Sequence, residues 1–317
     1  MTRDPKVVAL GGGHGLSTSL AALRQLTREL CAVVTVADDG GSSGRIRREL
    51  GVLPPGDLRM ALATLSGSGD GCERLAALLQ HRFGGSGALA GHPVGNLIIT
   101  GLMELLNGDA VEALATVGRM VGAQGRVLPM SPVPLEIVAM VSGIDPDHPS
   151  DVRRIRGQVA VATTPGRVLS VALMPERPPA CPEAVAAIRA ADAVVLGPGS
   201  WFTSVLPHVL VPGLLDAMVR TEARIVVTLN LAPQPGETEG FSPQELLDAL
   251  YRHAPKLLIH TVLADEEAVI DRRGLTDTVH ARGARLVLAP VAAADGTARH
   301  DPDRLAAALA PVIGVDR

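Results

Sequence analysis

The stretch "VVALGGGHGLSTSLAALRQLTRELCAVVTVA", residues 7–37, decides the fold. It begins and ends with apolar, strand-like runs. Between them lie a glycine-rich turn and a segment of helical periodicity, which Ser17 or Thr18 would cap and which extends to about Leu30. A strand, a helix and a second strand in this order predict the βαβ unit of a parallel sheet.

The same alternation returns later in the chain. Short apolar runs predict further strands at residues 193–196, 225–229, 257–262 and 285–291, with helices between them. In the middle of the chain prolines cluster and apolar residues alternate, which indicates hairpins. We therefore predict one domain over residues 1–317: a Rossmann-like, three-layer α/β/α fold with a mostly parallel sheet and a small β-rich insertion at about residues 126–175.

Composition narrows the class of protein. The 317 residues are 47% hydrophobic, enough for a large core, and the net charge of −4 argues against a nucleic-acid partner. Three cysteines without CxxC spacing predict a reducing, cytoplasmic setting. The apolar stretch 127–144 is interrupted by three prolines and a glutamate, so we expect no membrane span.

The first strand runs into "LGGGHGLS", residues 10–17. Glycines that open a helix after a strand allow the backbone to approach a phosphate, and the helix N-terminus offers free N–H groups. The spacing departs from the dinucleotide fingerprint, because Leu16 stands where a third glycine would be needed, and no P-loop lysine follows. A tight turn that only packs the helix on the strand is the alternative.

Two adjacent carboxylates, Asp38 and Asp39, follow the second strand. One acid would suit a ribose, and two suggest that one holds a divalent cation such as Mg²⁺. Because side chains alternate in extended chain, we expect Asp39 to face the ligand or a metal and Asp38 to anchor the loop. Ser42, Ser43 and Arg45 are candidate phosphate contacts. A capped turn without a ligand is the alternative.

A third loop, "LGPGSWFTS" at residues 196–204, repeats the pattern of strand, glycine-rich turn and helix start. Gly199, Ser200 and Thr203 are therefore candidate phosphate donors. The aromatic pair Trp201 and Phe202 would either stack on a nucleobase or anchor the helix in the core.

Two asparagines complete the set of candidates. Asn230 ends a later strand and begins a polar loop, and Asn96 stands at the start of an apolar helix, where capping that helix is its alternative role.

Together these motifs resemble one family. "GGGHGLS", "VADDGGSSGRIRREL", "PPGDLR", "GNL", "LGPGSWFTS" and "QPGETEG" match, in order, the motifs of the gluconeogenesis factor (YvcK-like) family, within the superfamily of the 2-phospho-L-lactate transferases (CofD-like). His14 stands where the family more often has threonine. Carried over by motif, the resemblance implies nucleotide-binding roles for Gly12, Gly13, Gly15, Asp38, Asp39, Asn96, Gly197, Gly199 and Ser200.

The resemblance also implies a function. It implies a cytoplasmic protein that binds UDP-sugars without catalysis or a required cofactor, and that supports cell shape and cell-wall synthesis during gluconeogenic growth. A homodimer and regulatory protein partners are further expectations. One alternative is a Mg²⁺-dependent phospholactate-type transferase with Asp39 as a metal ligand, and a second is an NAD-binding oxidoreductase. The segment Asp145–Arg154 has no functional interpretation.

Overall fold

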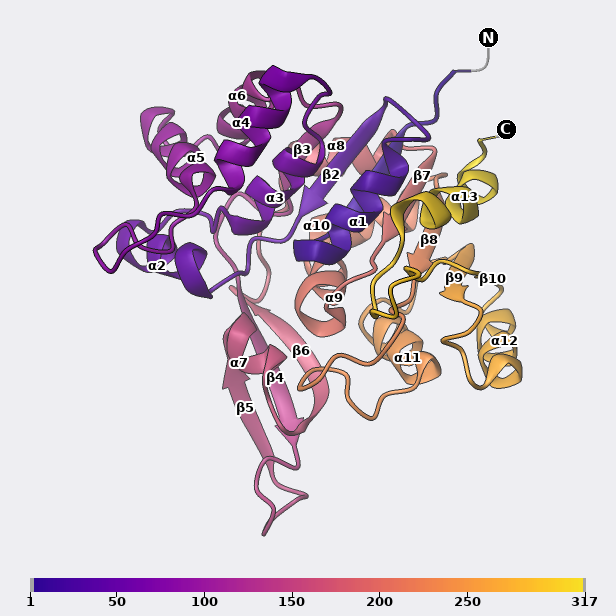
Figure 1. Ribbon diagram of the computed structural model, residues 1–317. Coiled ribbons are helices and arrows are strands. Elements are labelled where there is room, and N and C mark those ends of the chain that lie inside the picture. The colour runs from indigo at the N-terminus through magenta and orange to yellow at the C-terminus, as the bar shows by residue number, and fades with distance from the viewer. Residues whose placement is uncertain (1–2, 316–317) are drawn as a thin grey trace.

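A seven-stranded parallel sheet forms the centre of the protein, which we describe from a computed structural model covering residues 3–315 (Figure 1). The strand order is β10-β9-β8-β7-β1-β2-β3, and neighbouring strands are parallel throughout. The strands are β1 (Val7–Gly11), β2 (Leu30–Val34), β3 (Arg126–Pro129), β7 (Ala193–Leu196), β8 (Arg224–Thr228), β9 (Thr261–Asp265) and β10 (Arg285–Ala289). This confirms the predicted fold class.

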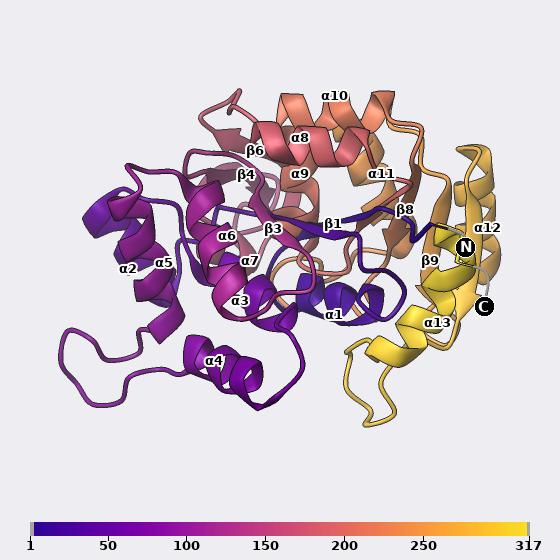
Figure 2. The same cartoon turned by 90° about the horizontal axis from the view of Figure 1, so that it is seen from above.

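Helices cover both faces of the sheet, as Figure 2 shows: α8 (Pro182–Arg189) and α10 (Pro212–Arg220) lie on one face, and α1 (Gly13–Leu23) and α13 (Pro302–Ile313) on the other. Apart from the edge strand β10, which is only partly buried, the strands between the layers are almost continuously apolar and buried, as parallel strands covered on both faces must be. The other helices of the parallel part are α2 (Gly41–Leu50), α3 (Gly56–Thr64), α4 (Asp70–Gln80), α5 (Val94–Leu105), α6 (Ala110–Met120), α9 (Leu206–Leu210), α11 (Pro243–His253) and α12 (Arg272–Ala281).

A small antiparallel sheet is inserted between β3 and β7, and it projects from the main body in Figure 1. Its strands are β4 (Glu136–Ser142), β5 (Val152–Arg156) and β6 (Arg167–Met174), in the order β5-β4-β6. The predicted start of the insertion near residue 126 was wrong, because β3 pairs with β2 in the parallel sheet. The helix α7 (Gln158–Ala162) was not predicted, because its sequence alternates like a strand.

The first helix also begins earlier than predicted. It starts at Gly13 rather than after Ser17, and it ends at Leu23, seven residues before Leu30. The glycine-rich turn is therefore part of the helix N-terminus. All three cysteines are free. Within residues 3–315 no single helix is long and apolar enough to cross a membrane; Trp201–Leu210 and Pro212–Arg220 meet that test only as a pair bent by 75°.

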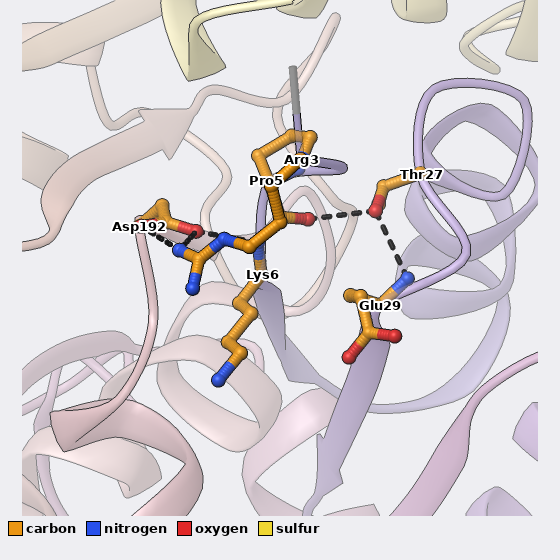
Figure 3. A network of polar contacts seen from close by, with 6 residues as sticks. All are labelled: Arg3, Pro5, Lys6, Thr27, Glu29 and Asp192. Carbon is orange, nitrogen blue, oxygen red and sulfur yellow. Dashed lines mark hydrogen bonds and ion pairs between the residues drawn. The ribbon is translucent and has the colours of Figure 1, made fainter. Parts of the chain in front are cut away.

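The N-terminal ends of the strands are fastened by polar contacts, drawn in Figure 3. Asp192, just before β7, accepts hydrogen bonds from the Arg3 guanidinium at 2.9 Å and from the Lys6 N–H at 2.7 Å. On the other side of the segment that leads into β1, the Thr27 hydroxyl donates to the Pro5 carbonyl at 2.6 Å. These contacts hold together the N-terminal ends of β7, β1 and β2, at the end of the sheet opposite to the glycine-rich loops.

Candidate functional site

The strand order reverses between β1 and β7, and the glycine-rich loops gather at this point. From β1 the chain moves outward through β2 to β3, and it returns to the other side of β1 for β7 and the later strands. Ligands of such sheets bind beyond the carboxyl ends of the strands at this switch point. Helix α1 starts here, and its N-cap residue, Gly12, has no side chain that could cap it.

A pocket of about 280 Å³ opens at the switch point. Four segments line it: the start of α1, the loop after β7, the loop after β8, and the loop that leads into α13. Its polar side chains include the exposed His14, the predicted residue Asn230, and the neighbours Arg299 and His300. Prolines and leucine form much of the remaining wall, so the lining of the pocket has an apolar part and a polar part.

The glycines of the first loop permit close contact between segments. A Cβ atom at Gly15 would lie 2.3 Å from the Pro198 carbonyl oxygen, and one at Gly12 would lie 2.5 Å from an Asp57 carboxylate oxygen. Gly13 has a φ of +56°. Gly12 and Gly15 are therefore fixed by packing, and this packing brings α1 against both flanking loops.

Asp57 lies at the start of α3 and faces the N-terminus of α1. Its carboxylate accepts the Gly13 N–H, and burial, with the neighbouring charge of Asp38, raises the pKa of Asp57 to about 7. Asp38 also accepts the Gly40 N–H at 2.9 Å. Two carboxylates therefore meet beside α1, where sequence reasoning had found only one of them.

Asp39 contacts the β-rich insertion. It accepts the Val159 N–H at 3.0 Å, and its other oxygen lies 2.3 Å from the place of a Cβ at Gly157. Asp39 therefore bonds the N-terminus of α7 and ties the β-rich insertion to this loop. The expectation that Asp39 faces a ligand is corrected, because this carboxylate contacts the insertion. Asp38 anchors its own loop, as expected, through the Gly40 N–H.

The backbone polar groups of the loop after β7 form hydrogen bonds with other parts of the protein. Asn230 accepts the Gly199 N–H at 2.9 Å and donates to the Gly199 carbonyl at 2.8 Å. Gly197, whose carbonyl accepts the Ser19 hydroxyl at 2.8 Å, has a φ of +75°. We therefore correct the expectation that the Gly199 N–H is free for phosphate; Gly199 lines the pocket, and Asn230 fixes its orientation.

Glu237 caps the helical turn that follows this loop. This buried carboxylate accepts the N–H groups of Phe202 at 3.0 Å and Thr203 at 2.9 Å, and burial raises its pKa. The predicted donor Thr203 is fully buried, and Ser200 immediately precedes this turn. Trp201 and Phe202 are buried too, so the aromatic pair anchors the core and does not stack on a ligand.

Four other predicted residues hold helices together. The Asn96 amide donates to the Ser42 hydroxyl at 2.9 Å and accepts from Arg59 at 2.9 Å, in a buried network. Ser43 accepts the Gly56 N–H at 3.0 Å, and Arg45 donates to the Ala90 carbonyl at 2.7 Å. In this structure Ser42, Ser43, Arg45 and Asn96 thus bind protein groups outside the pocket.

Comparison with known proteins identifies the family. The sequence profile described as 2-phospho-L-lactate transferase CofD matches residues 7–293. The chain belongs to the CofD family. Within this family, a candidate gluconeogenesis factor of Mycobacterium leprae is 56% identical over 309 residues, which covers 96% of this chain and 85% of that protein.

Two further comparisons support this assignment. The gluconeogenesis factor of Bacillus subtilis is 36% identical over 271 residues, covering 86% of this chain and 82% of its own length. The crystal structure of a UPF0052 family protein from Bacillus halodurans superposes with a TM-score of 0.86 at 31% identity, covering 98% of this chain and 99% of that one. The predicted resemblance to the gluconeogenesis factors is confirmed.

Sequence reasoning missed three polar residues of this CofD-family site: Asp57, Arg299 and His300. Asp57 had a local signal, since "PPGD" places an acid in the first turn of a helix, where carboxylates are favoured. Arg299 and His300 had none, because their loop reaches the pocket from the far end of the chain. Among residues 3–315, no group of three or more His, Cys, Asp or Glu side chains is placed to hold a metal ion.

Proposed function

We propose that this chain is a nucleotide-sugar-binding protein of the gluconeogenesis factor type, and that UDP-sugars are its ligands. The observation that carries the proposal is the pocket at the switch point between β1 and β7, which is lined by apolar residues and by the first turn of an 11-residue helix. A nucleotide needs both parts: flat apolar walls for the base, and N–H groups for the diphosphate.

The polar part of the pocket lining suits the negative charge of the diphosphate. Gly15, in the first turn of α1, lines the pocket, and the dipole of the helix favours negative charge there. Arg299 also lines the pocket, and its side chain is 73% exposed; its guanidinium is held by an exposed ion pair with Asp295 at 3.3 Å and by a hydrogen bond to the Thr297 hydroxyl at 3.2 Å. Such a weak surface pair releases the guanidinium readily. Arg299 would then bind the diphosphate.

The proposal is of a binding protein without catalysis. The carboxylates and hydroxyls of the predicted site are largely committed to protein partners, as Asp39 is to α7 and Ser42 is to Asn96. In the cell, the bound UDP-sugar would couple this protein to cell shape and wall synthesis during gluconeogenic growth, as a cytoplasmic regulator with protein partners or as a homodimer. No cofactor is required for this role.

The second candidate function is a Mg²⁺-dependent phospholactate-type transferase. It is favoured by one observation: Asp38 lies near the buried Asp57, and the charge of Asp38 adds to the effect of burial in raising the pKa of Asp57. A divalent cation prefers such carboxylate oxygens and would relieve their repulsion. In this reading the metal would be held by Asp38 and Asp57, and not by Asp39.

Calorimetry with UDP-N-acetylglucosamine, UDP-glucose and NAD, each in EDTA and in Mg²⁺, tests both functions. We expect the UDP-sugars to bind without Mg²⁺. Arg299→Gln should weaken binding roughly 10- to 100-fold, the usual weight of a charge-assisted contact, while Arg273→Gln on α12 should have no effect. Binding of NAD alone would overturn the proposal. Mg²⁺-dependent binding together with turnover would favour the transferase.

A further inference from the structure

Strand β10 forms an open edge of the seven-stranded sheet. It is the last strand in the order, it pairs with β9 on one side, and it lies beside α12 at the end of the molecule (Figure 1). Its residues Leu286, Val287, Leu288 and Ala289 are partly exposed, whereas every residue of β9 is buried. Within residues 3–315, no strand pairs with its outer side. Such an edge presents unpaired N–H and C=O groups to any strand that can approach it.

The hydrogen bonds to β9 determine which groups of β10 face outward. The N–H of Arg285, the first residue of β10, and the carbonyl of Ala289, the last, bond to backbone groups that flank β9, at 2.9 and 3.2 Å. Backbone groups alternate in direction along a strand, so the first, third and fifth residues face β9. The N–H and C=O groups of Leu286 and Leu288 therefore point outward. In the described part of the chain, no turn or loop backbone bonds to either leucine.

A second copy of β10 matches this edge. When two copies run antiparallel about a two-fold axis at Val287, Leu286 of each copy lies opposite Leu288 of the other. The residues with outward groups then face one another, and each such pair can exchange both of its hydrogen bonds. Val287 lies opposite its own copy, and Arg285 lies opposite Ala289, so no like charges meet. Leucines line one face of the junction and valines the other. The edge is therefore complementary to itself.

The other edge of the sheet, strand β3, lacks these groups. The Met130 N–H, just after β3, donates to the Val34 carbonyl of β2 at 2.8 Å, so by the same alternation Val127 and Pro129 point outward. Pro129 has no N–H to donate, and Val127 is buried. A sheet with one open edge and one closed edge can join one further copy, and the joined sheet then ends in β3 on both sides. Pairing through β10 therefore stops at a dimer.

We propose that two copies of this chain associate through β10, so that their two seven-stranded sheets become one continuous sheet about a two-fold axis at Val287. The inference concerns assembly and does not rest on the nucleotide ligand of the proposed function. Strands β8 and β9 separate this junction from β7 and from the switch point. Nucleotide binding is therefore expected in the dimer and in the monomer, and the failure of either proposal leaves the other standing.

Sedimentation equilibrium of the full chain tests the proposal. Wild-type protein should sediment at micromolar concentrations with twice the 32.8 kDa mass of the chain. Leu288→Pro removes one outward N–H and leaves the bonds to β9 in place, and Leu286→Lys adds a charge to the edge. Both variants should be monomeric, with the fold checked by circular dichroism. Leu105→Lys is the matched control, because Leu105 is a 75% exposed leucine on α5, and it should stay dimeric.

Disulfide cross-linking tests the register, and it applies even when the edge variants fail to fold. The experiment uses a Cys72→Ser chain, because Cys72 is the one native cysteine that is not buried. Val287→Cys should yield a covalent dimer, since its two Cα atoms would lie about 4.5 Å apart across the axis. Arg285→Cys should stay unlinked, since its two copies would lie about 13 Å apart along the strands.

Three results would overturn the inference. The first is a wild-type protein that stays monomeric throughout the micromolar range. The second is a dimer that persists in folded Leu288→Pro and is not linked by Val287→Cys, because the contact would then lie on another face. The third is a monomer in which only a strand of a different protein slows amide exchange at Leu286 and Leu288, because the edge would then belong to that partner.

Discussion

Replacing Gly15 by alanine should destabilise the protein and damage the pocket together. The added Cβ would lie 2.3 Å from the Pro198 carbonyl oxygen and 2.6 Å from the Gly199 Cα. Ordinary van der Waals contact begins at 3.4 Å, so the two loops must separate by about 1.1 Å. Both obstructing atoms belong to the backbone, and a side-chain rotation cannot relieve the contact.

The cost can be estimated from these contacts. Overpacking of this kind costs about 1–3 kcal/mol. Moving Gly199 also strains its two hydrogen bonds to Asn230, at 2.9 and 2.8 Å, each with a net contribution of about 1 kcal/mol. We therefore expect a loss of about 2–5 kcal/mol in the free energy of unfolding. For a chain of 317 residues this lowers Tm by roughly 3–8 °C.

Urea denaturation and thermal unfolding measure this loss. Gly101→Ala is the matched control, because Gly101 lies inside α5 and an added Cβ meets nothing within 4 Å. The control should gain about 0.5–1 kcal/mol, since alanine favours the helix over glycine. A Gly15→Ala protein as stable as wild type, with unchanged UDP-sugar affinity, would refute the close packing of the two loops at the switch point.

Two further predictions concern the acids beside α1. The pKa of Asp57 is raised from 3.8 to about 7 in the folded protein, so its contribution to stability is complete below about pH 4 and is lost as the pH rises through 7. Asp57→Asn should flatten this decline, and urea midpoints in EDTA between pH 4 and 8 that keep the wild-type slope would contradict it. Asp39→Ala should remove the bond to the Val159 N–H, worth about 1 kcal/mol, so hydrogen exchange in α7 should accelerate roughly fivefold. Unchanged exchange in α7 would show that Asp39 does not hold the insertion.

The parallel sheet could be predicted because its signals are local. The apolar runs of β1 and β7, each followed by glycines, identify strands that end in tight turns, and both were located to within a residue. The start of the insertion could not be located, because the four residues of β3 read equally well as part of a hairpin. Whether they pair with β2 is decided by tertiary contacts.

The candidate site was harder to predict for a related reason. The sequence marks loops rich in glycine and acids, but it does not show which polar groups are already used within the protein. Gly199 is a good candidate donor until Asn230, 31 positions away, is seen to bind it. His300 carries no motif, and its loop lines the pocket although it lies far along the chain from the glycine-rich loops.

The pairing of β1 with β7 has a consequence for how the chain is made. Val7 lies opposite Ala193, 186 positions later, so one side of β1 has no partner until more than half of the chain has been synthesised. At about 5–20 residues per second, this delay lasts roughly 10–40 s. During that time β1 can pair with β2 alone, and its open edge is a place for wrong pairing. The binding pocket, which needs loops from both strands, is therefore among the last features of the molecule to form.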